Sequence, residues 1–443
     1  MIENYIAKSV DCACGRPHRS KTEHIAIRQG VIDGALIPFL LERGYKRLTV
    51  VCDENTYRVA AEQVCKALEQ ASIGYKLHKY TGVVLPNEHF IGNLTLGADL
   101  GCDLLLAVGS GTIGDICRYV SALMGKDYCI VGTAPSMDGY NSGSSALIFN
   151  NTKITYETHT PLAVFLDPDI LAAAPMPMIA SGAGDLLGKI NCITDWRLSR
   201  IVTGEWFCDF IAGIVDAAVE KVLKNAAGLA EQNADAIGDL VEALLLSGVG
   251  MDFAGNSRPA SGCEHHLSHF WEMRYLLEGR EAVFHGTKVG IGTVITLKAY
   301  EYIARLNPDF AAIRQLPRKT ADQWEAEIRE AFLGASEEIL ALERKAGKNS
   351  PEKLAIRLDA IEANWEQIRA LAAATPKATV VRDILVSMDA PTQPAQIGVE
   401  KEMARQAICY AKELRDRYTV LQLLWDLGEL EHFADQIIDE YYA

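Results

Sequence analysis

Short strand-like segments alternate with helical segments over the first 175 residues, and this alternation constrains the fold more than any other feature of the chain. The strand-like segments are apolar runs or alternate apolar and polar residues, and they cover residues 47–52, 75–80, 103–108 and 128–133. Between the first two, residues 59–68 repeat apolar side chains with the period of a helix. Strands that alternate with helices form mostly parallel sheets with helices on both faces. We therefore expect an α/β domain with a Rossmann-like, mostly parallel sheet.

The pattern changes at two proline–methionine steps near residue 175, which indicate a turn between domains. From there on, apolar residues recur with a period close to 3.6, so the sequence predicts helices throughout. The expected helices cover residues 210–223, 235–247, 288–304, 320–333, 336–346, 351–373, 399–415 and 420–433. We therefore expect an α/β domain over residues 1–175 and an all-α domain over residues 176–443.

Composition argues against several classes of function. The chain has 43 Lys and Arg against 58 Asp and Glu, and a net charge of −15 disfavours binding to nucleic acids or anionic membranes. No apolar run is long enough to span a bilayer, and the N-terminus lacks the pattern of a signal peptide. The 11 cysteines are scattered and odd in number, as expected for reduced thiols. We expect a cytoplasmic protein without membrane insertion.

Three histidines and one acid have the residue types of a metal site. His265 and His269 lie four residues apart, on one face of an expected helix, and His285 follows in the next segment. Asp185 stands in a glycine-containing segment 80 residues before His265. One carboxylate and imidazoles from distant segments suit a divalent metal with an open coordination position. The alternative is that these are unrelated core or surface histidines.

Two loops that follow expected strands have the composition of a cofactor site. Residues 109–115 read Gly-Ser-Gly-Thr-Ile-Gly-Asp, where glycines let the backbone approach a pyrophosphate and a helix N-terminus supplies N–H dipoles. The standard dinucleotide fold carries this motif on its first strand, whereas here it follows a later one, and a turn without a ligand is the alternative. Residues 133–145 are rich in hydroxyl groups and contain Asp138. The two loops together predict a cofactor crevice at the C-terminal edge of the sheet.

A small cluster near the N-terminus has the residue types of a metal knuckle. Cys12, Cys14 and His18 occur within seven residues, beside Gly15. Structural zinc normally takes four ligands, and the sequence does not indicate the remaining partner. The alternative is a turn with buried thiols.

Several of these motifs together resemble the sn-glycerol-1-phosphate dehydrogenases, in the superfamily of dehydroquinate synthase, glycerol dehydrogenase and iron-containing alcohol dehydrogenases. The resemblance covers roughly residues 20–300 and follows the family's order of motifs. These are the late glycine loop, Thr-Ala-Pro-Ser-Met-Asp-Gly at 133–139, Gly-Asp-Leu at 184–186, and Arg-Pro-Ala-Ser-Gly at 258–262 before Glu264 and His265. Additional helices after about residue 305 are similar to those of the bacterial, arabinose-operon-associated type. The resemblance implies a dehydroquinate synthase-like fold.

The resemblance also implies a role for particular residues. Asp185, His265 and His285 would bind the metal. Asp138, Asp185 and His269 would contact the substrate, with Asp185 and His269 as the catalytic residues and His269 a candidate to relay the substrate's proton. Side-chain chemistry, apart from the resemblance, makes Lys189 and Arg258 candidates to hold a phosphate group, since lysine offers a point charge and arginine a bidentate fork. The alternative for each is a surface salt bridge. Asp53 would contact the adenosine ribose. The remaining cofactor residues would be Gly111, Thr112, Ile113, Gly114, Asp115, Thr133, Ala134, Pro135, Ser136 and Ser142.

The implied activity is metal-dependent reduction of dihydroxyacetone phosphate to sn-glycerol 1-phosphate by NAD(P)H, for glycerophospholipid synthesis. Residues 1–175 would bind NAD or NADP, and residues 176–443 would bind the substrate and one divalent metal. An Asp-His-His ligand set suits zinc or nickel, and iron as well. The substrate would be a phosphorylated triose. The apolar helical half leads us to expect a homodimer.

Three other functions stay open at this point. A glycerol or other polyol dehydrogenase would share the metal and cofactor sites but would not recognise phosphate. A dehydroquinate synthase-like lyase would favour Glu in place of Asp185 and would lack the 133–139 run. A non-enzymatic metal- or nucleotide-binding regulator would not need an open coordination position.

Overall fold

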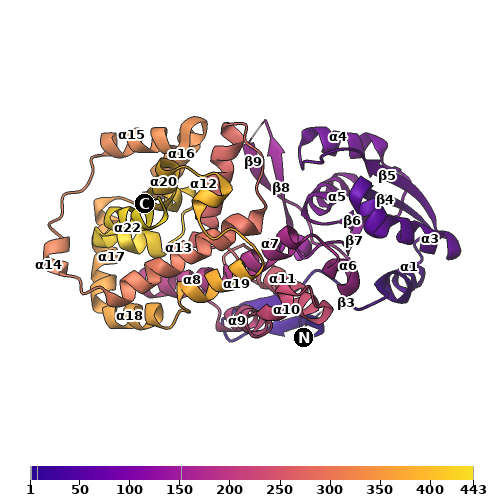
Figure 1. Cartoon of the computed structure of the whole chain (residues 1–443), viewed down its shortest axis with the longest axis horizontal. Helices are drawn as coiled ribbons and strands as arrows, with labels where there is room; N and C mark the ends of the chain where they lie inside the picture. The colour runs from indigo at the N-terminus through magenta and orange to yellow at the C-terminus, as the bar shows by residue number, and fades with distance from the viewer. Residues whose placement is uncertain (1, 7, 151, 443) are drawn as a thin grey trace. The chain divides into compact units, whose positions relative to one another are not determined.

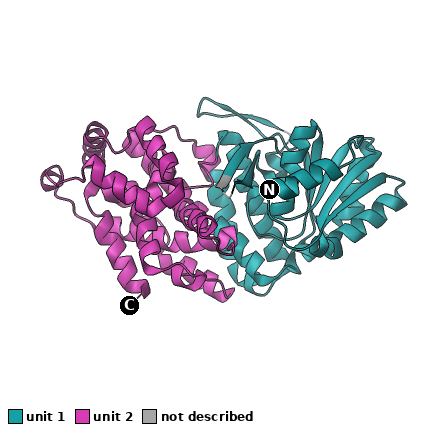
Figure 2. Ribbon diagram, turned by 90° about the horizontal axis from the view of Figure 1, so that it is seen from above, with its two compact units in different colours: residues 1–186, 213–256 teal, residues 187–212, 257–443 magenta. Residues whose placement is uncertain are grey.

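The computed structural model describes residues 2–6, 8–150 and 152–442. The chain forms two compact units, and each is interrupted once in the sequence (Figure 2). Unit 1 comprises Met1–Leu186 and Gly213–Asn256, and unit 2 comprises Leu187–Ala212 and Ser257–Ala443. The division at residue 175, which follows the change from mixed strands and helices to helices alone, stays a prediction.

A six-stranded sheet forms the centre of unit 1 (Figure 1). Its order is β3-β10-β7-β6-β4-β5, and every neighbouring pair is parallel. The strands are β3 (His24–Ile27), β4 (Arg47–Asp53), β5 (Gly74–Tyr80), β6 (Leu104–Gly109), β7 (Asp127–Gly132) and β10 (Ala163–Leu166). The four predicted strands are confirmed to within one residue at each end, because their apolar runs are local signals. The two edge-side strands β3 and β10 were not predicted.

Unit 1 also contains the helices α1 (Ile37–Glu42), α3 (Glu62–Gln70), α4 (Glu88–Gly97), α5 (Gly111–Met124), α6 (Pro168–Ala172), α7 (Met176–Leu187), α10 (Ala226–Ala230) and α11 (Ala234–Ala254). Alternate residues of β4, among them Leu48 and Val50, share one apolar cluster with Val64 and Leu68 of α3. All six residues of β6 are buried, as expected for a central strand covered on both faces. The α/β prediction for this part of the chain is therefore confirmed.

Two small antiparallel hairpins were not predicted. One pairs β1 (Ser9–Asp11) with β2 (Pro17–Arg19), and the other pairs β8 (Ser144–Phe149) with β9 (Thr152–Glu157). The first encloses the Cys12–Arg16 turn, and the second begins at the end of the hydroxyl-rich segment 133–145.

The regular secondary structure of the described residues in unit 2 is all helical, which confirms the predicted helical half. Its longer helices are α8 (Lys189–Thr203), α12 (Cys263–Leu277), α13 (His285–Arg305), α15 (Ala321–Phe332), α16 (Ser336–Ala346), α17 (Pro351–Ala363), α18 (Trp365–Ala373), α19 (Ala378–Ser387), α20 (Lys401–Tyr410), α21 (Val420–Leu427) and α22 (Leu430–Tyr442). The prediction of single helices over 351–373 and 420–433 was wrong. The first breaks at Asn364 and the second at Gly428, which has φ +78° and so ends α21 in a left-handed cap.

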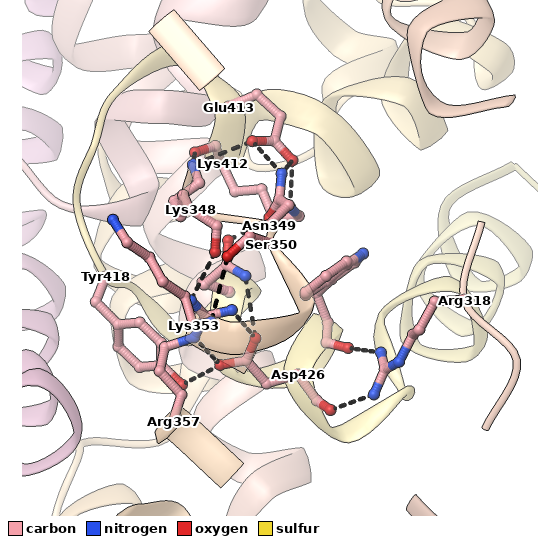
Figure 3. A network of polar contacts seen from close by, with 12 residues as sticks. Arg318, Lys348, Asn349, Ser350, Lys353, Arg357, Lys412, Glu413, Tyr418 and Asp426 are labelled. Atoms are coloured by element: carbon pink, nitrogen blue, oxygen red, sulfur yellow. Dashed lines mark hydrogen bonds and ion pairs between the residues drawn. The ribbon is translucent and has the colours of Figure 1, made fainter. Parts of the chain in front are cut away.

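A buried polar network joins the C-terminal helices of unit 2 (Figure 3). Arg357 donates two hydrogen bonds of 2.7 Å to the Asp426 carboxylate, which also accepts one of 2.9 Å from the Tyr418 hydroxyl. Glu413 pairs with Lys412 and, at 3.1 Å, with Lys348. Burial favours a raised pKa for Glu413, but the two ammonium groups outweigh it and lower the pKa to about 2. The network therefore holds charged groups inside the unit in paired form.

Among the described residues, no helix is both long enough and apolar enough to cross a membrane. The cysteines of the described chain form no disulfide.

Candidate active site

The glycine loop lies at the point where the strand order of the sheet reverses. The chain places β5 on one side of β4 and then crosses to place β6 on the other side. Asp53 is the last residue of β4, and Gly109 is the last residue of β6. Open α/β sheets bind ligands in the crevice at such a switch point, at the C-terminal ends of the strands. The loop therefore occupies the position typical of a nucleotide site although it follows a later strand.

Contacts at this edge bring the two predicted cofactor loops together. The Thr133 amide donates to the Gly109 carbonyl at 3.2 Å, and the hydroxyl oxygens of Ser110 and Ser136 lie 2.6 Å apart. A Cβ on Gly109 would lie 2.7 Å from Cβ of Ile113, so the turn into α5 requires glycine at that position. Residues 111–115 form the first turn of α5, and residues 133–136 lie beside it.

Three other predicted cofactor residues make local contacts. Asp53 caps the short helix α2 (Glu54–Thr56), accepting hydrogen bonds of 2.8 Å from the amides of Asn55 and Thr56. Asp115 forms an ion pair of 2.5 Å with Arg118. The Ser142 hydroxyl accepts a hydrogen bond of 3.1 Å from the Ser144 amide. These contacts fix the three side chains, and their roles toward a cofactor stay predictions.

Asp185 is fully buried on α7 and contacts the second loop. Its carboxylate accepts a hydrogen bond of 2.9 Å from the Asp138 amide, and the Asp138 carboxylate accepts one of 2.9 Å from Ser247. A Cβ on Gly182 would lie 1.7 Å from the Pro135 carbonyl oxygen, so glycine lets α7 approach this loop. The structure thus brings together the two predicted acids, and Ser247 is a partner that sequence reasoning missed.

The three predicted histidines gather within unit 2. His265 and His269 lie one turn apart on α12, and His285 is the first residue of α13. Ring centroids are 5.2 Å apart for His265 and His285, 5.7 Å for His269 and His285, and 6.0 Å for His265 and His269. A Cβ on Gly292 would lie 2.5 Å from the Glu264 carbonyl oxygen, so glycine lets α13 pack closely against α12. This packing brings His285 beside the other two rings.

One carboxylate hydrogen-bonds an imidazole of this cluster and a second lies beside another imidazole, and sequence reasoning missed both. The Nδ1–H of His265 donates to the buried Glu264 carboxylate at 2.7 Å, and the same oxygen accepts from the Gly262 amide at 2.8 Å. A Glu272 oxygen lies 3.6 Å from Nδ1 of His269. Metal-binding histidines typically donate their second ring N–H to such a carboxylate. Glu264 directly precedes His265, and Glu272 follows His269 by three residues; these spacings were the signals that could have identified the two carboxylates.

The basic candidates are buried and engaged in contacts within unit 2. Lys189 donates from Nζ to the Ala260 carbonyl at 3.0 Å. Arg258 donates to Glu205 at 3.1 Å and to the Tyr418 carbonyl at 2.9 Å. Arg417, which sequence reasoning missed, donates to the Ser261 carbonyl at 2.9 Å; burial and the charge of Arg258 lower the pKa of Arg417 to about 10. Lys189 and Arg417 thus bind carbonyl groups of the segment that precedes α12 and that contains Arg258.

Each unit carries its own set of reactive groups. Unit 1 has a buried carboxylate and glycine-containing loops at a switch point, and unit 2 has three clustered imidazoles with carboxylates beside two of them. Within unit 2, ligand atoms of His269, Glu272 and His285 all lie within 4.8 Å of one another. Imidazole and carboxylate groups suit a divalent transition metal.

Comparisons with known proteins agree with this chemistry. Residues 26–175 match the iron-containing alcohol dehydrogenases. A glycerol-1-phosphate dehydrogenase (NAD(P)+) from Halalkalibacterium halodurans is 32% identical over 419 residues, covering 94% of this chain and 95% of that protein. One from Bacillus licheniformis is 31% identical over 432 residues, covering 96% of this chain and 95% of that protein.

A solved structure supports the fold. Glycerol dehydrogenase from Schizosaccharomyces pombe has a TM-score of 0.60 at 15% identity, covering 95% of this chain and 92% of that chain. The alignments with these two relatives, both more than 30% identical, cover nearly the whole length of each relative and nearly all of this chain. The chain therefore belongs to the glycerol-1-phosphate dehydrogenase family of NAD(P)-dependent oxidoreductases.

Proposed function

We propose that this protein reduces dihydroxyacetone phosphate to sn-glycerol 1-phosphate with NAD(P)H, for glycerophospholipid synthesis. The names of the relatives support the product and the cofactor class. The observation that carries the proposal is the cluster of His265, His269 and His285, whose ring centroids lie 5.2–6.0 Å apart. Carboxylates of Glu264 and Glu272 lie beside two of these rings.

We further propose that Asp185, His265 and His285 hold one divalent metal, with zinc, nickel and iron all compatible with the set. The donors fit this role because Nδ1 of His265 already donates to Glu264, which leaves Nε2 as its metal-binding atom. When bound, the metal supplies a Lewis acid for the substrate oxygen and the nicotinamide supplies the hydride.

Two residues are proposed to contact the substrate. Nδ1 of His269 lies 3.6 Å from a Glu272 oxygen, near enough for the carboxylate to stabilise a protonated imidazole. His269 would bind the substrate hydroxyl or relay its proton. Asp138, held by Ser247, would accept a hydrogen bond from a substrate hydroxyl.

We propose that residues 111–115, residues 133–136 and Ser142 line the NAD(P) site. The loops lie at the switch point, where the first turn of α5 presents backbone N–H groups that favour a pyrophosphate. Asp53 would accept hydrogen bonds from the adenosine ribose, a role that favours NAD over NADP.

The substrate proposal is tested with NADH oxidation on dihydroxyacetone phosphate and on dihydroxyacetone, with chiral analysis of the product. Lys189 and Arg258 are proposed to hold the phosphate. Replacing either with Ala should cost about 1.5–3 kcal/mol in transition-state stabilisation, and only for the phosphorylated substrate. Equal losses on both substrates would assign the residue to the fold, as the Glu205 contact of Arg258 would predict. A wild-type preference for dihydroxyacetone would place the chain with the polyol dehydrogenases.

The metal proposal is tested with His265→Ala. This variant should lose both the catalytic metal and activity, whereas His432→Ala, which changes an exposed histidine on α22, should keep both. Retention of the catalytic metal by His265→Ala would contradict the ligand assignment. Cytoplasmic location and a homodimer are further expectations, to be checked by fractionation and by light scattering.

A further inference from the structure

The turn between β1 and β2 presents two thiols and an imidazole to one another. Ligand atoms of Cys12, Cys14 and His18 all lie within 4.8 Å. The Gly15 amide donates to the Cys12 carbonyl at 3.1 Å, and Gly15 has φ +84°, a left-handed conformation that glycine adopts without strain. The turn is therefore built to bring Cys12 and Cys14 back toward β2.

His18 is oriented with one nitrogen toward these thiols. Its side chain is fully buried and stacks on Phe253, with ring centroids 5.4 Å apart. Nδ1 lies 3.1 Å from the Phe253 carbonyl oxygen, which can only accept, so the proton resides on Nδ1. Nε2 then carries the lone pair, and it lies 3.3 Å from Cys14 Sγ. This arrangement is the one in which a carbonyl orients a metal-binding histidine.

The spacing of these atoms fits a tetrahedral zinc ion. Zinc bonds of about 2.3 Å to sulfur and about 2.0 Å to nitrogen place neighbouring ligand atoms about 3.5 Å apart. The separation of Cys14 Sγ and His18 Nε2 is 3.3 Å. In addition, each strand of the hairpin has only three residues, so the strand pairing itself contributes little stability to the turn. A metal would hold the turn in place.

Cys208 is the best candidate for the fourth ligand. It is fully buried and directly precedes α9 (Asp209–Lys224), whose residues from Gly213 onward belong to unit 1. The five residues from Cys208 to Gly213 correspond to about 7.5 Å of helix rise, so Cys208 is close in the chain to the part of α9 that belongs to unit 1. Most other cysteines lie on the strands and helices of the two cores.

We propose that Cys12, Cys14, His18 and Cys208 bind one structural zinc ion. Binding releases the three thiol protons to solvent and involves no change of oxidation state. Four protein ligands close the coordination sphere, so this ion takes no part in the dehydrogenase reaction. The proposal is independent of the catalytic metal, because no cysteine belongs to the Asp-His-His set.

Cobalt substitution distinguishes the two sites, because only a site with cysteine ligands gives thiolate-to-cobalt charge-transfer bands in the near ultraviolet. The intact protein is purified under reducing conditions, stripped of metal and titrated with Co²⁺. We expect these bands in the wild type and in His265→Ala. They should fall by about one third in Cys14→Ser and in Cys208→Ser, since one of three thiolates is lost. Cys102→Ser, at a buried thiol of unit 1, is the matched control and should be unchanged.

Elemental analysis gives a second readout that does not depend on cobalt. His265→Ala grown with zinc should retain one zinc per chain, and the double variant with Cys14→Ser should retain little or none after dialysis against a weak chelator. Absence of charge-transfer bands from the folded wild type, or a zinc-free His265→Ala, would overturn the site. Full bands in Cys208→Ser would overturn the assignment of the fourth ligand.

Discussion

Replacement of Glu264 tests how the protein prepares His265 for a metal. The Glu264 carboxylate is fully buried, and one of its oxygens accepts from both His265 Nδ1 at 2.7 Å and the Gly262 amide at 2.8 Å. In Glu264→Ala, both donors lose this acceptor. His265 can then rotate or take the other tautomer, which places a proton on the nitrogen that we propose binds the metal.

The expected cost has two parts. Loss of the carboxylate partner of a metal-binding histidine typically lowers metal affinity by about 10- to 100-fold, which corresponds to about 1.4–2.7 kcal/mol. The Gly262 amide, left without its acceptor inside the protein, adds a cost of about 1–3 kcal/mol to folding. Glu264→Gln keeps an oxygen that can accept one of the two hydrogen bonds, so its loss of metal affinity should be smaller than that of the Ala variant.

The assay is a competition titration of apoprotein with zinc against a chelating dye, with thermal unfolding measured in parallel. Glu281→Ala changes an exposed carboxylate in the loop before α13 and serves as the control. The reasoning predicts the order wild type and control, then Glu264→Gln, then Glu264→Ala, in decreasing metal affinity. Unchanged zinc affinity in a folded Glu264→Ala protein would refute the role assigned to this contact.

Three further predictions address unit 2 and the cofactor loop. Asp426→Ala should lower the free energy of unfolding by about 3–5 kcal/mol because it leaves Arg357 charged and buried. The double variant Arg357→Met, Asp426→Leu should lose less stability. A larger loss of stability in the double variant, measured by chemical denaturation, would contradict this reasoning. Lys348 and Lys412 hold the pKa of Glu413 at about 2 against an ordinary 4.5. The free energy of unfolding should therefore fall as the pH drops from about 5 toward 2, and the slope of that free energy against pH should be smaller in Glu413→Gln. Gly111→Val should weaken NADH binding, measured by fluorescence titration, since a Cβ added at position 111 would lie 3.3 Å from the Met137 methyl group and the larger side chain would displace the loop; unchanged affinity would exclude the loop from the cofactor site.

Local signals in the sequence were sufficient for much of the fold. Strands β4, β5, β6 and β7 were predicted to within one residue at each end because each is a short run of apolar, or alternating apolar and polar, side chains. The spacing of His265 and His269 also fixed their common face, since four residues make about one helical turn. The helix breaks at Asn364 and Gly428 were missed because the apolar period continues across both.

The sequence by itself determined the chemical inventory of the protein, namely which residues can bind a metal, hold a proton or let a backbone come close. Tertiary structure decided which of them meet. The order of strands placed the glycine loop at the switch point, close packing at Gly292 brought His285 beside His265, and close packing at Gly182 brought α7 to the loop of Asp138. The physical reason is that strand order and helix contacts depend on residues far apart in the chain, whereas periodicity reports only on neighbours within a turn or two.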